Sequence, residues 1–79
     1  MELQEFIQNF ANQFDDTDAE LFSPSTLFRD LDEWSSLIGL SIILMVDEEY
    51  GITIGADDMK KAQTIEELFN VVKSKANGF

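Results

Sequence analysis

Two adjacent hydroxyl side chains, Ser35 and Ser36, stand directly before a long apolar segment. A serine at the start of a helix is most often a cap, whose hydroxyl accepts a hydrogen bond from a first-turn backbone amide. The first turn also presents free N–H groups and the positive end of the helix dipole, which would stabilise a phosphodiester on a hydroxyl there. These residues alone leave both interpretations open, a helix cap and a site of phosphate attachment.

The residue types that are missing restrict the chemistry further. The chain contains no Cys and no His. Without them it cannot build a disulfide, a thiolate metal site, a catalytic Ser-His-Asp triad or the usual general base. We therefore expect a protein that is not an enzyme, with no catalytic residue and no metal site.

A cluster of acidic residues at 15–20 raises the alternative of a calcium-binding domain. Counted from Asp16, the sixth position of such a loop is Leu21 rather than Gly, and the twelfth is Leu27 rather than Glu. Both departures remove features that a calcium loop needs, a sharp turn and a bidentate ligand. The spacing favours a solvated acidic loop.

Length and charge limit the remaining functions. With 79 residues, we expect a single domain over 1–79, and a hydrophobic content of 44% argues against disorder. A formal net charge of -11 repels nucleic-acid phosphates and anionic lipids and attracts basic protein surfaces. The start of the chain has no basic region, and no apolar run approaches the roughly 18 residues of a membrane span. We expect a cytoplasmic monomer, with no nucleic-acid partner and no membrane span.

The segment after the two serines predicts a helix over Ser36–Tyr50. It has no proline, Ser35 is a plausible cap, and Gly51 stands where a left-handed C-terminal cap is usual. One side of this helix carries the residues expected in the core: Gly39, Ile42, Ile43, Val46 and Tyr50. Met45 lies between the two sides, with a core position favoured.

The opposite side of this helix mixes apolar and acidic side chains. Its members are Leu37, Leu40, Leu44, Asp47 and Glu48, with Ser41 beside them. One interpretation is a central helix in a small bundle, with Leu40 and Leu44 covered by the loop. The other is an exposed apolar patch rimmed by carboxylates, which is typical of a site that docks basic partners.

Three further helices are predicted around this one. The first is an N-terminal helix whose apolar stripe comprises Leu3, Phe6, Ile7, Phe10 and Phe14. The second is a short helix at 57–62, preceded by an extended connector at 52–55. The last starts at a capping box, Thr64 to Glu67, and its apolar stripe comprises Ile65, Leu68, Phe69 and Val72. Lys73 and Lys75 complement its C-terminal dipole, and Gly78 is predicted just beyond its end.

Between the first two helices we expect a long loop and then a short turn. Ser23 and Pro24 form a pair suited to a helix start, and the turn carries Leu27, Phe28 and Leu31. The predicted fold is an all-α four-helix bundle with three longer helices and a short third one. Its predicted core comprises Phe6, Ile7, Phe10, Ile43, Val46, Tyr50, Ile54, Leu68, Phe69 and Val72. Lys60 and Lys61 fit a solvated charged turn, to which we assign no role.

The order of these elements resembles the acyl carrier protein family over nearly the whole chain. Members of the family share the motif Asp-Ser-Leu at the start of their second helix, and here the segment 34–37 places Ser36 directly before Leu37. Residues 46–54 look like the acidic end of that helix and its hydrophobic connector. The segments 57–62 and 64–68 resemble the third and fourth helices of the family.

The resemblance implies that Ser36 carries 4'-phosphopantetheine, a phosphoserine-linked arm that a phosphopantetheinyl transferase adds from coenzyme A. It implies that the arm's thiol holds acyl intermediates as thioesters for loading and processing enzymes of fatty-acid biosynthesis, a polyketide pathway or a specialised pathway. The residues expected to contact these partners are Leu37, Ile38, Leu40, Ser41, Leu44, Asp47 and Glu48. An aminoacyl or peptidyl carrier and an unmodified acidic helical interaction module remain alternatives.

The chain departs from the family pattern at two places. Ser35 replaces the usual Asp, which keeps a capping group but removes a carboxylate beside the modified serine. Ile38 and Ser41 stand where fatty-acid synthesis members are often acidic. These departures predict slower arm transfer or a dedicated transferase, and a more apolar docking surface suited to a specialised pathway.

Overall fold

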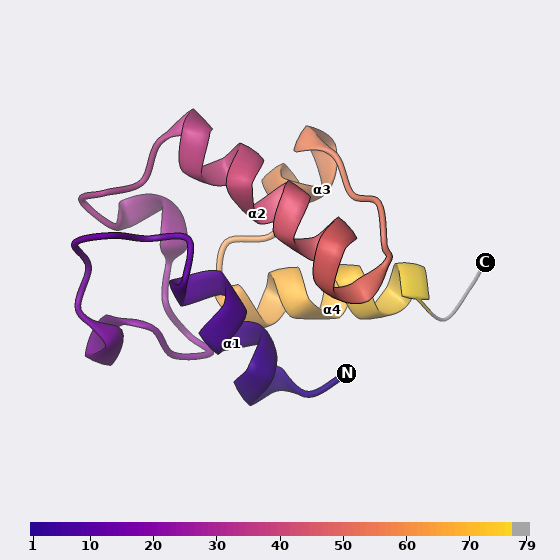
Figure 1. Cartoon of the computed structure of the whole chain (residues 1–79), viewed down its shortest axis with the longest axis horizontal. Coiled ribbons are helices and arrows are strands. Elements are labelled where there is room, and N and C mark those ends of the chain that lie inside the picture. Colours follow the sequence, from indigo (N-terminus) through magenta and orange to yellow (C-terminus); the bar gives the residue numbers. More distant parts are fainter. Residues whose placement is uncertain (77–79) are drawn as a thin grey trace.

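The structure, a computed structural model, describes residues 1–76, and it is helical (Figure 1). Its elements in chain order are α1 (Leu3–Ala11), η1 (Ala19–Leu21), η2 (Phe28–Asp30), α2 (Ser36–Tyr50), α3 (Ala56–Lys61) and α4 (Ile65–Ala76). The labels η1 and η2 denote single 3-10 turns. The predicted all-α class, with three longer helices and a short third one, is confirmed over residues 1–76. Gly78, predicted just beyond the last helix, lies outside the described residues.

The helices pack in pairs around one core. Helix α1 contacts both α2 and α4, and α3 contacts α4. In Figure 1 the long segment between α1 and α2, which contains both 3-10 turns, lies at one end of the molecule. No helix within residues 1–76 is long and apolar enough to cross a membrane.

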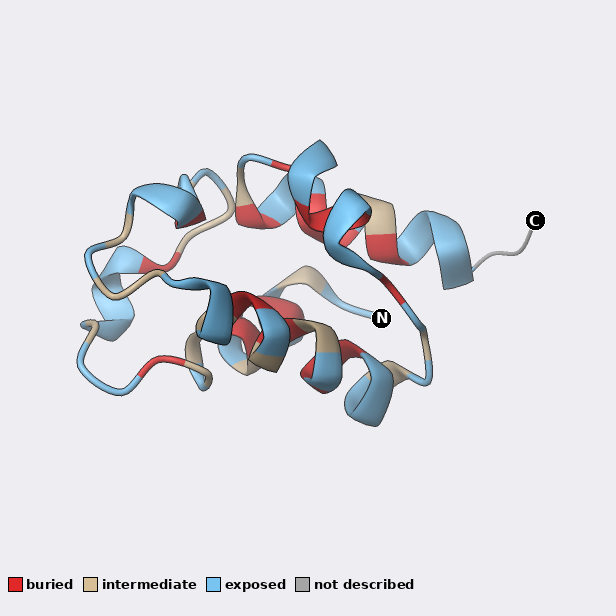
Figure 2. Ribbon diagram, turned by 90° about the horizontal axis from the view of Figure 1, so that it is seen from above, coloured by how far each residue is buried: buried red, intermediate tan, exposed pale blue. Residues whose placement is uncertain are grey.

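The buried side chains form one cluster, and they lie on the inward faces of the helices (Figure 2). Eight of the ten predicted core residues are buried: Phe6, Ile7, Phe10, Val46, Ile54, Leu68, Phe69 and Val72. Ile43 and Tyr50 are only half-buried and pack against the edge of the cluster. Met45 is buried, as favoured.

The first helix is shorter than its apolar stripe predicts. It ends at Ala11, and two turn hydrogen bonds follow, from the Gln13 amide to the Phe10 carbonyl and from the Phe14 amide to the Ala11 carbonyl. Phe14 is still buried, at 7% exposure, because these turns keep its ring directed at the core. The stripe therefore predicted the burial of Phe14 and overestimated the length of the helix.

The pair Ser23 and Pro24, whose residue types suit a helix start, lies in a turn of the predicted loop, and the predicted short turn that carries Phe28 follows it as η2. The Thr26 amide donates to the Ser23 carbonyl at 3.1 Å and closes a turn. The Thr26 hydroxyl accepts from the Ser23 amide at 2.8 Å and donates to the Leu21 carbonyl at 2.6 Å. These bonds satisfy the local backbone groups within the turn, so no helical turn is needed to pair them.

The loop before α2 is tied down at two points. The Phe28 amide donates to the Gln63 carbonyl at 3.3 Å and the Ile65 amide to the Thr26 carbonyl at 3.2 Å, which joins the loop to the start of α4. The Glu33 carboxylate accepts from the Asp15 and Asp16 amides at 2.7 and 3.0 Å. The loop thus has a defined path despite its lack of helical periodicity.

The short helix α3 is held by Asp58. Its carboxylate accepts from the Gly55 amide at 3.0 Å, which caps the helix start, and it lies 3.4 Å from the Lys75 ammonium and 3.8 Å from that of Lys61. Asp58 is buried, at 8% exposure. The preceding connector at 52–55 is extended without strand pairing, as predicted. The Asp58 carboxylate therefore fixes α3 against the end of α4.

The predicted capping box at the start of α4 is confirmed. The Glu67 amide donates to the Thr64 hydroxyl at 3.1 Å, and the Glu67 carboxylate accepts from the Thr64 amide at 3.2 Å. The same carboxylate accepts from the Gln63 amide at 2.7 Å. This box holds α4 next to the point where the loop joins it.

Asp58 gives the stability of the fold a defined pH dependence. The pKa of Asp58 lies below its ordinary value, chiefly because its carboxylate accepts a hydrogen bond from the Gly55 amide. Burial raises this pKa, and the Lys75 ammonium lowers it further. A lowered pKa in the folded state contributes stability above the unfolded pKa of about 3.9, and this stability is lost as pH falls through the folded pKa. We expect Asp58→Asn to lower the free energy of unfolding by about 1 kcal/mol at neutral pH and to flatten its decline in acid. Urea unfolding from neutral to acid pH measures both effects.

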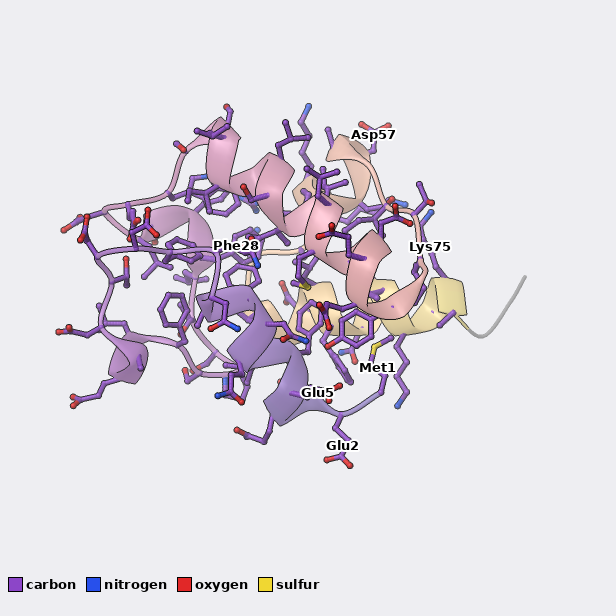
Figure 3. The ribbon with its side chains drawn as sticks, viewed as in Figure 1. Met1, Glu2, Glu5, Phe28, Asp57 and Lys75 are labelled. Carbon is purple, nitrogen blue, oxygen red and sulfur yellow. The ribbon has the colours of Figure 1, made fainter. Side chains whose placement is uncertain are left out.

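The matched control for this prediction is Asp57→Asn. Asp57 lies on α3, is exposed, and points away from the rest of the molecule (Figure 3). It makes no salt bridge within the described residues. Its replacement should therefore leave the decline of the unfolding free energy at acid pH as in the unsubstituted protein. If the unfolding free energy declines equally in acid for Asp58→Asn and the unsubstituted protein, the role given to Asp58 is wrong.

Candidate functional site

The structure separates the roles of the two adjacent serines. The Ser35 hydroxyl accepts a hydrogen bond from the Ile38 amide at 3.2 Å, and Ser35 has extended backbone angles, so it is the cap of α2. Ser36 is the first residue of α2 and is exposed. Its hydroxyl has no hydrogen-bond partner within residues 1–76. The capping interpretation therefore applies to Ser35, and the hydroxyl of Ser36 is accessible for attachment.

Helix α2 ends at the predicted glycine cap, and its first turn carries no negative charge. Gly51 ends the helix in the left-handed conformation, with φ of 65°, which glycine adopts without steric cost. The first turn of α2 contains no acidic residue. An anionic group on Ser36 would therefore meet the positive end of the helix dipole without a carboxylate beside it in that turn.

Ser36 lies on the wall of a groove between α2 and α3, which we call the α2–α3 groove. Its volume is about 340 Å³. The lining residues are Arg29, Trp34, Ser36, Gly39, Leu40, Ile43, Ala56, Met59 and Lys60. The lining is mostly apolar, apart from the Ser36 hydroxyl and two cationic side chains. A chemical group attached to Ser36 therefore starts at an apolar surface.

One wall of the α2–α3 groove is fixed by aromatic packing. The Trp34 ring lies 5.1 Å from the Phe28 ring between centroids, and Phe28 is fully buried. The indole also lies close to α2, because a Cβ atom built on Gly39 would stand 3.4 Å from it. Phe28 lies inside the molecule (Figure 3), so the core determines where Trp34 stands.

Arg29 is held at the groove by two contacts. Its Nη1 donates to the Met59 carbonyl at 2.9 Å, and its guanidinium carbon lies 5.0 Å from the centroid of the Phe28 ring. The hydrogen bond to Met59 joins the turn η2 to α3. Lys60, the next residue along α3, lines the same groove and is exposed.

The leucines on the outer side of α2 are exposed. Leu37 is 72% exposed, Leu40 52% and Leu44 54%, and we call these three residues the leucine stripe. The interpretation that a loop covers them is wrong, since the loop packs on α4 instead. The predicted residues Asp47 and Glu48 are also exposed, while Ser41 is half-buried.

One predicted partner contact has a different environment. Ile38 is half-buried and packs against the core cluster. Its side chain therefore presents less apolar surface than the leucine stripe does. The exposed part of the predicted docking surface consists of the stripe with the carboxylates near its C-terminal end.

The sequence prediction missed the five groove residues that lie outside α2. These are Arg29, Trp34, Ala56, Met59 and Lys60, which come from the segment before α2 and from α3. The sequence predicts no role for Lys60 and Lys61, but Lys61 pairs with Asp58 and Lys60 lines the groove. The sequence feature that could have pointed to Arg29 and Lys60 is the scarcity of basic residues in this acidic chain.

The acidic residues at 15–20 do not gather into a site. Within residues 1–76, no group of three or more His, Cys, Asp or Glu side chains is placed to hold a metal ion. The backbone at Asp15 and Asp16 instead donates to Glu33, as does the Thr17 hydroxyl at 2.6 Å. These bonds lower the pKa of Glu33, the Thr17 bond most strongly.

No protein-family model matches the chain, and no solved structure matches it. The resemblance to acyl carrier proteins therefore rests on the residues of the sequence, and it stays a prediction.

The burial pattern along α2 leads to a stability prediction. Ile42 is fully buried, so Ile42→Ala should lower the free energy of unfolding by about 2–4 kcal/mol through lost burial and the cavity left behind. Leu44→Gln removes an exposed leucine and retains helix propensity, so its effect should stay within about 0.5 kcal/mol. Chemical denaturation measures both. Comparable losses for the two variants would show that the leucine stripe is covered.

Proposed function

We propose that this protein is a carrier that bears 4'-phosphopantetheine on Ser36 and presents acyl intermediates to partner enzymes, without being an enzyme itself. The observation that carries the proposal is that the two serines at the start of α2 have different roles. Ser35 caps the helix, while Ser36 offers an exposed hydroxyl that is not engaged by the described residues. A helix needs only one cap, so the second hydroxyl is available for chemistry.

The residues around Ser36 fit the group. A phosphodiester on the Ser36 oxygen would stand at the first turn of a fifteen-residue helix, where the dipole stabilises negative charge by about 0.3–1 kcal/mol. No first-turn carboxylate opposes it. The α2–α3 groove provides an apolar surface next to the attachment point. When bound, the group supplies a thiol that holds an acyl chain as a thioester.

The modification consumes coenzyme A and requires a transferase. The Ser36 oxygen forms a bond to the phosphorus that carries the pantetheine group, and the bond from that phosphorus to 3',5'-ADP breaks. The hydroxyl proton leaves to a base of the transferase, and 3',5'-ADP departs with the electron pair. The product is a phosphodiester, and no oxidant or reductant is needed.

The leucine stripe provides a docking surface for the partner enzymes. Its three exposed leucines lie along α2 from the turn that holds Ser36, and Asp47 and Glu48 lie near its C-terminal end. An apolar patch with carboxylates beside it fits partners with apolar, basic surfaces, and the net charge of -11 steers them toward it. A tether on Ser36 then raises the effective concentration of its cargo at a docked enzyme.

The attachment site can be tested by intact-mass measurement. Coexpression with a broad-specificity phosphopantetheinyl transferase should add the mass of one phosphopantetheine group. Ser36→Ala should abolish this addition because it removes the accepting oxygen, whereas Ser35→Ala should retain it and lose about 1 kcal/mol of stability with the cap. A label that maps to Ser35 would refute the assignment to Ser36.

The missing carboxylate before Ser36 leads to a separate kinetic prediction. Ser35→Asp should accelerate transfer about fivefold, equivalent to ~1 kcal/mol, since the added charge attracts a basic transferase surface. The matched control is Ser35→Asn, which caps as well as Asp but carries no charge. Initial rates of arm transfer, followed by mass, compare the variants. Equal rates for Asp and Asn at position 35 would exclude the electrostatic explanation.

An unmodified interaction module is the second candidate, and the exposure of the leucine stripe favours it independently of Ser36. Such a module would bind its partner equally well before and after incubation with coenzyme A and transferases. Protein that stays unmodified with several transferases would favour this candidate over the carrier.

A further inference from the structure

The few cations of this acidic chain are unevenly placed. The sequence has five basic residues against sixteen acidic ones. Lys61 and Lys75 pair with Asp58, and the Lys73 ammonium lies 5.8 Å from the centroid of the Phe69 ring. The remaining two, Arg29 and Lys60, both line the α2–α3 groove beside Ser36. They come from different elements, η2 and α3, so the fold rather than local sequence brings them together.

Neither of the two cations is neutralised within the described residues. Arg29 makes no salt bridge there, and neither does Lys60. The guanidinium of Arg29 uses one of its five N–H donors on the Met59 carbonyl and is held over the Phe28 ring. Its remaining donors, and the ammonium of Lys60, are available to an anion in the groove.

We propose that Arg29 and Lys60 form an anion subsite that holds the phosphodiester of the arm on Ser36. This inference rests on the proposed function. The position of the phosphodiester is fixed by its bond to the Ser36 oxygen, and that residue lines the same groove as both cations. Arginine suits phosphate oxygens because its donors form a planar fork, and lysine adds a compact charge.

The subsite has a consequence for the carrier. A phosphodiester held by Arg29 and Lys60 places the first part of the arm along the groove, whose wall is formed by side chains such as Trp34 and Ile43. The two cations also offset part of the repulsion between the phosphodiester and the acidic chain. A basic surface on a partner competes with them for the phosphate, so docking and release of the arm are linked.

The test uses NMR on the arm-bearing protein. Arg29 is the only arginine of the chain, so its side-chain Nε–H gives a single assigned resonance. We expect this resonance to shift when the arm is added. We expect the phosphorus resonance of the arm in Lys60→Gln and Arg29→Gln to move toward that of the arm-bearing protein unfolded in urea, in which the same phosphodiester has no folded groove beside it. In about 1 M NaCl, where the screening length is ~3 Å, the unsubstituted protein should show the same movement.

The control variant is Lys73→Gln, which changes the net charge by the same amount outside the groove. Its phosphorus resonance should coincide with that of the unsubstituted protein. Lys60→Gln is the decisive variant, because Lys60 is exposed and makes no described contact in the core, whereas Arg29→Gln also removes the contacts to Met59 and Phe28.

The outcomes separate the two proposals. If intact mass shows the arm in place but the Arg29 resonance does not shift, the subsite is wrong and the carrier function stands. If Lys73→Gln moves the phosphorus resonance as far as Lys60→Gln does, the effect is one of net charge, and the subsite is again wrong. If the mass never rises, the carrier function and the subsite fail together.

Discussion

The packing of Phe28 between the core and Trp34 is the contact on which the site depends. Phe28 is fully buried, with its ring 5.5 Å from that of Phe10 and 5.1 Å from that of Trp34 between centroids. Burying a phenylalanine stabilises a fold by about 1.5–3 kcal/mol, more than most single hydrogen bonds contribute. The loop before α2 has only short turns, so this burial largely decides where it runs. Trp34 and Arg29, which both contact Phe28, take their places at the groove as a result.

The sequence predicted the features that depend on neighbours in the chain. The caps Ser35 and Gly51, the capping box of α4 and the short third helix follow from residues within a few positions of one another. Residue types alone do not determine the conformation at Ser23 and Pro24. The pair Ser23 and Pro24 looks like a helix start, but hydrogen bonds within its turn, together with the junction to α4, hold it in another conformation.

Sequence periodicity determines neither which face of α2 is exposed nor which residues form the α2–α3 groove. The pattern of α2 separates two faces but does not say what covers each one, so buried and exposed leucines were both consistent with it. The answer lies in the path of the preceding loop, which joins α4 at Thr26 and Phe28 and leaves the leucine stripe open. The groove combines residues from the loop, α2 and α3, and the only advance sign of its cations was their rarity in the chain.

Leu40 connects the two surfaces of the proposed carrier. It lines the α2–α3 groove and, at 52% exposure, also belongs to the leucine stripe. A partner that covers the stripe therefore also covers one edge of the groove, because a single side chain belongs to both. Since Ser36 precedes Leu40 by one helical turn, the attachment point lies at the end of the same edge. Docking on the stripe and access to the arm are therefore not independent, because the geometry of one helix determines both.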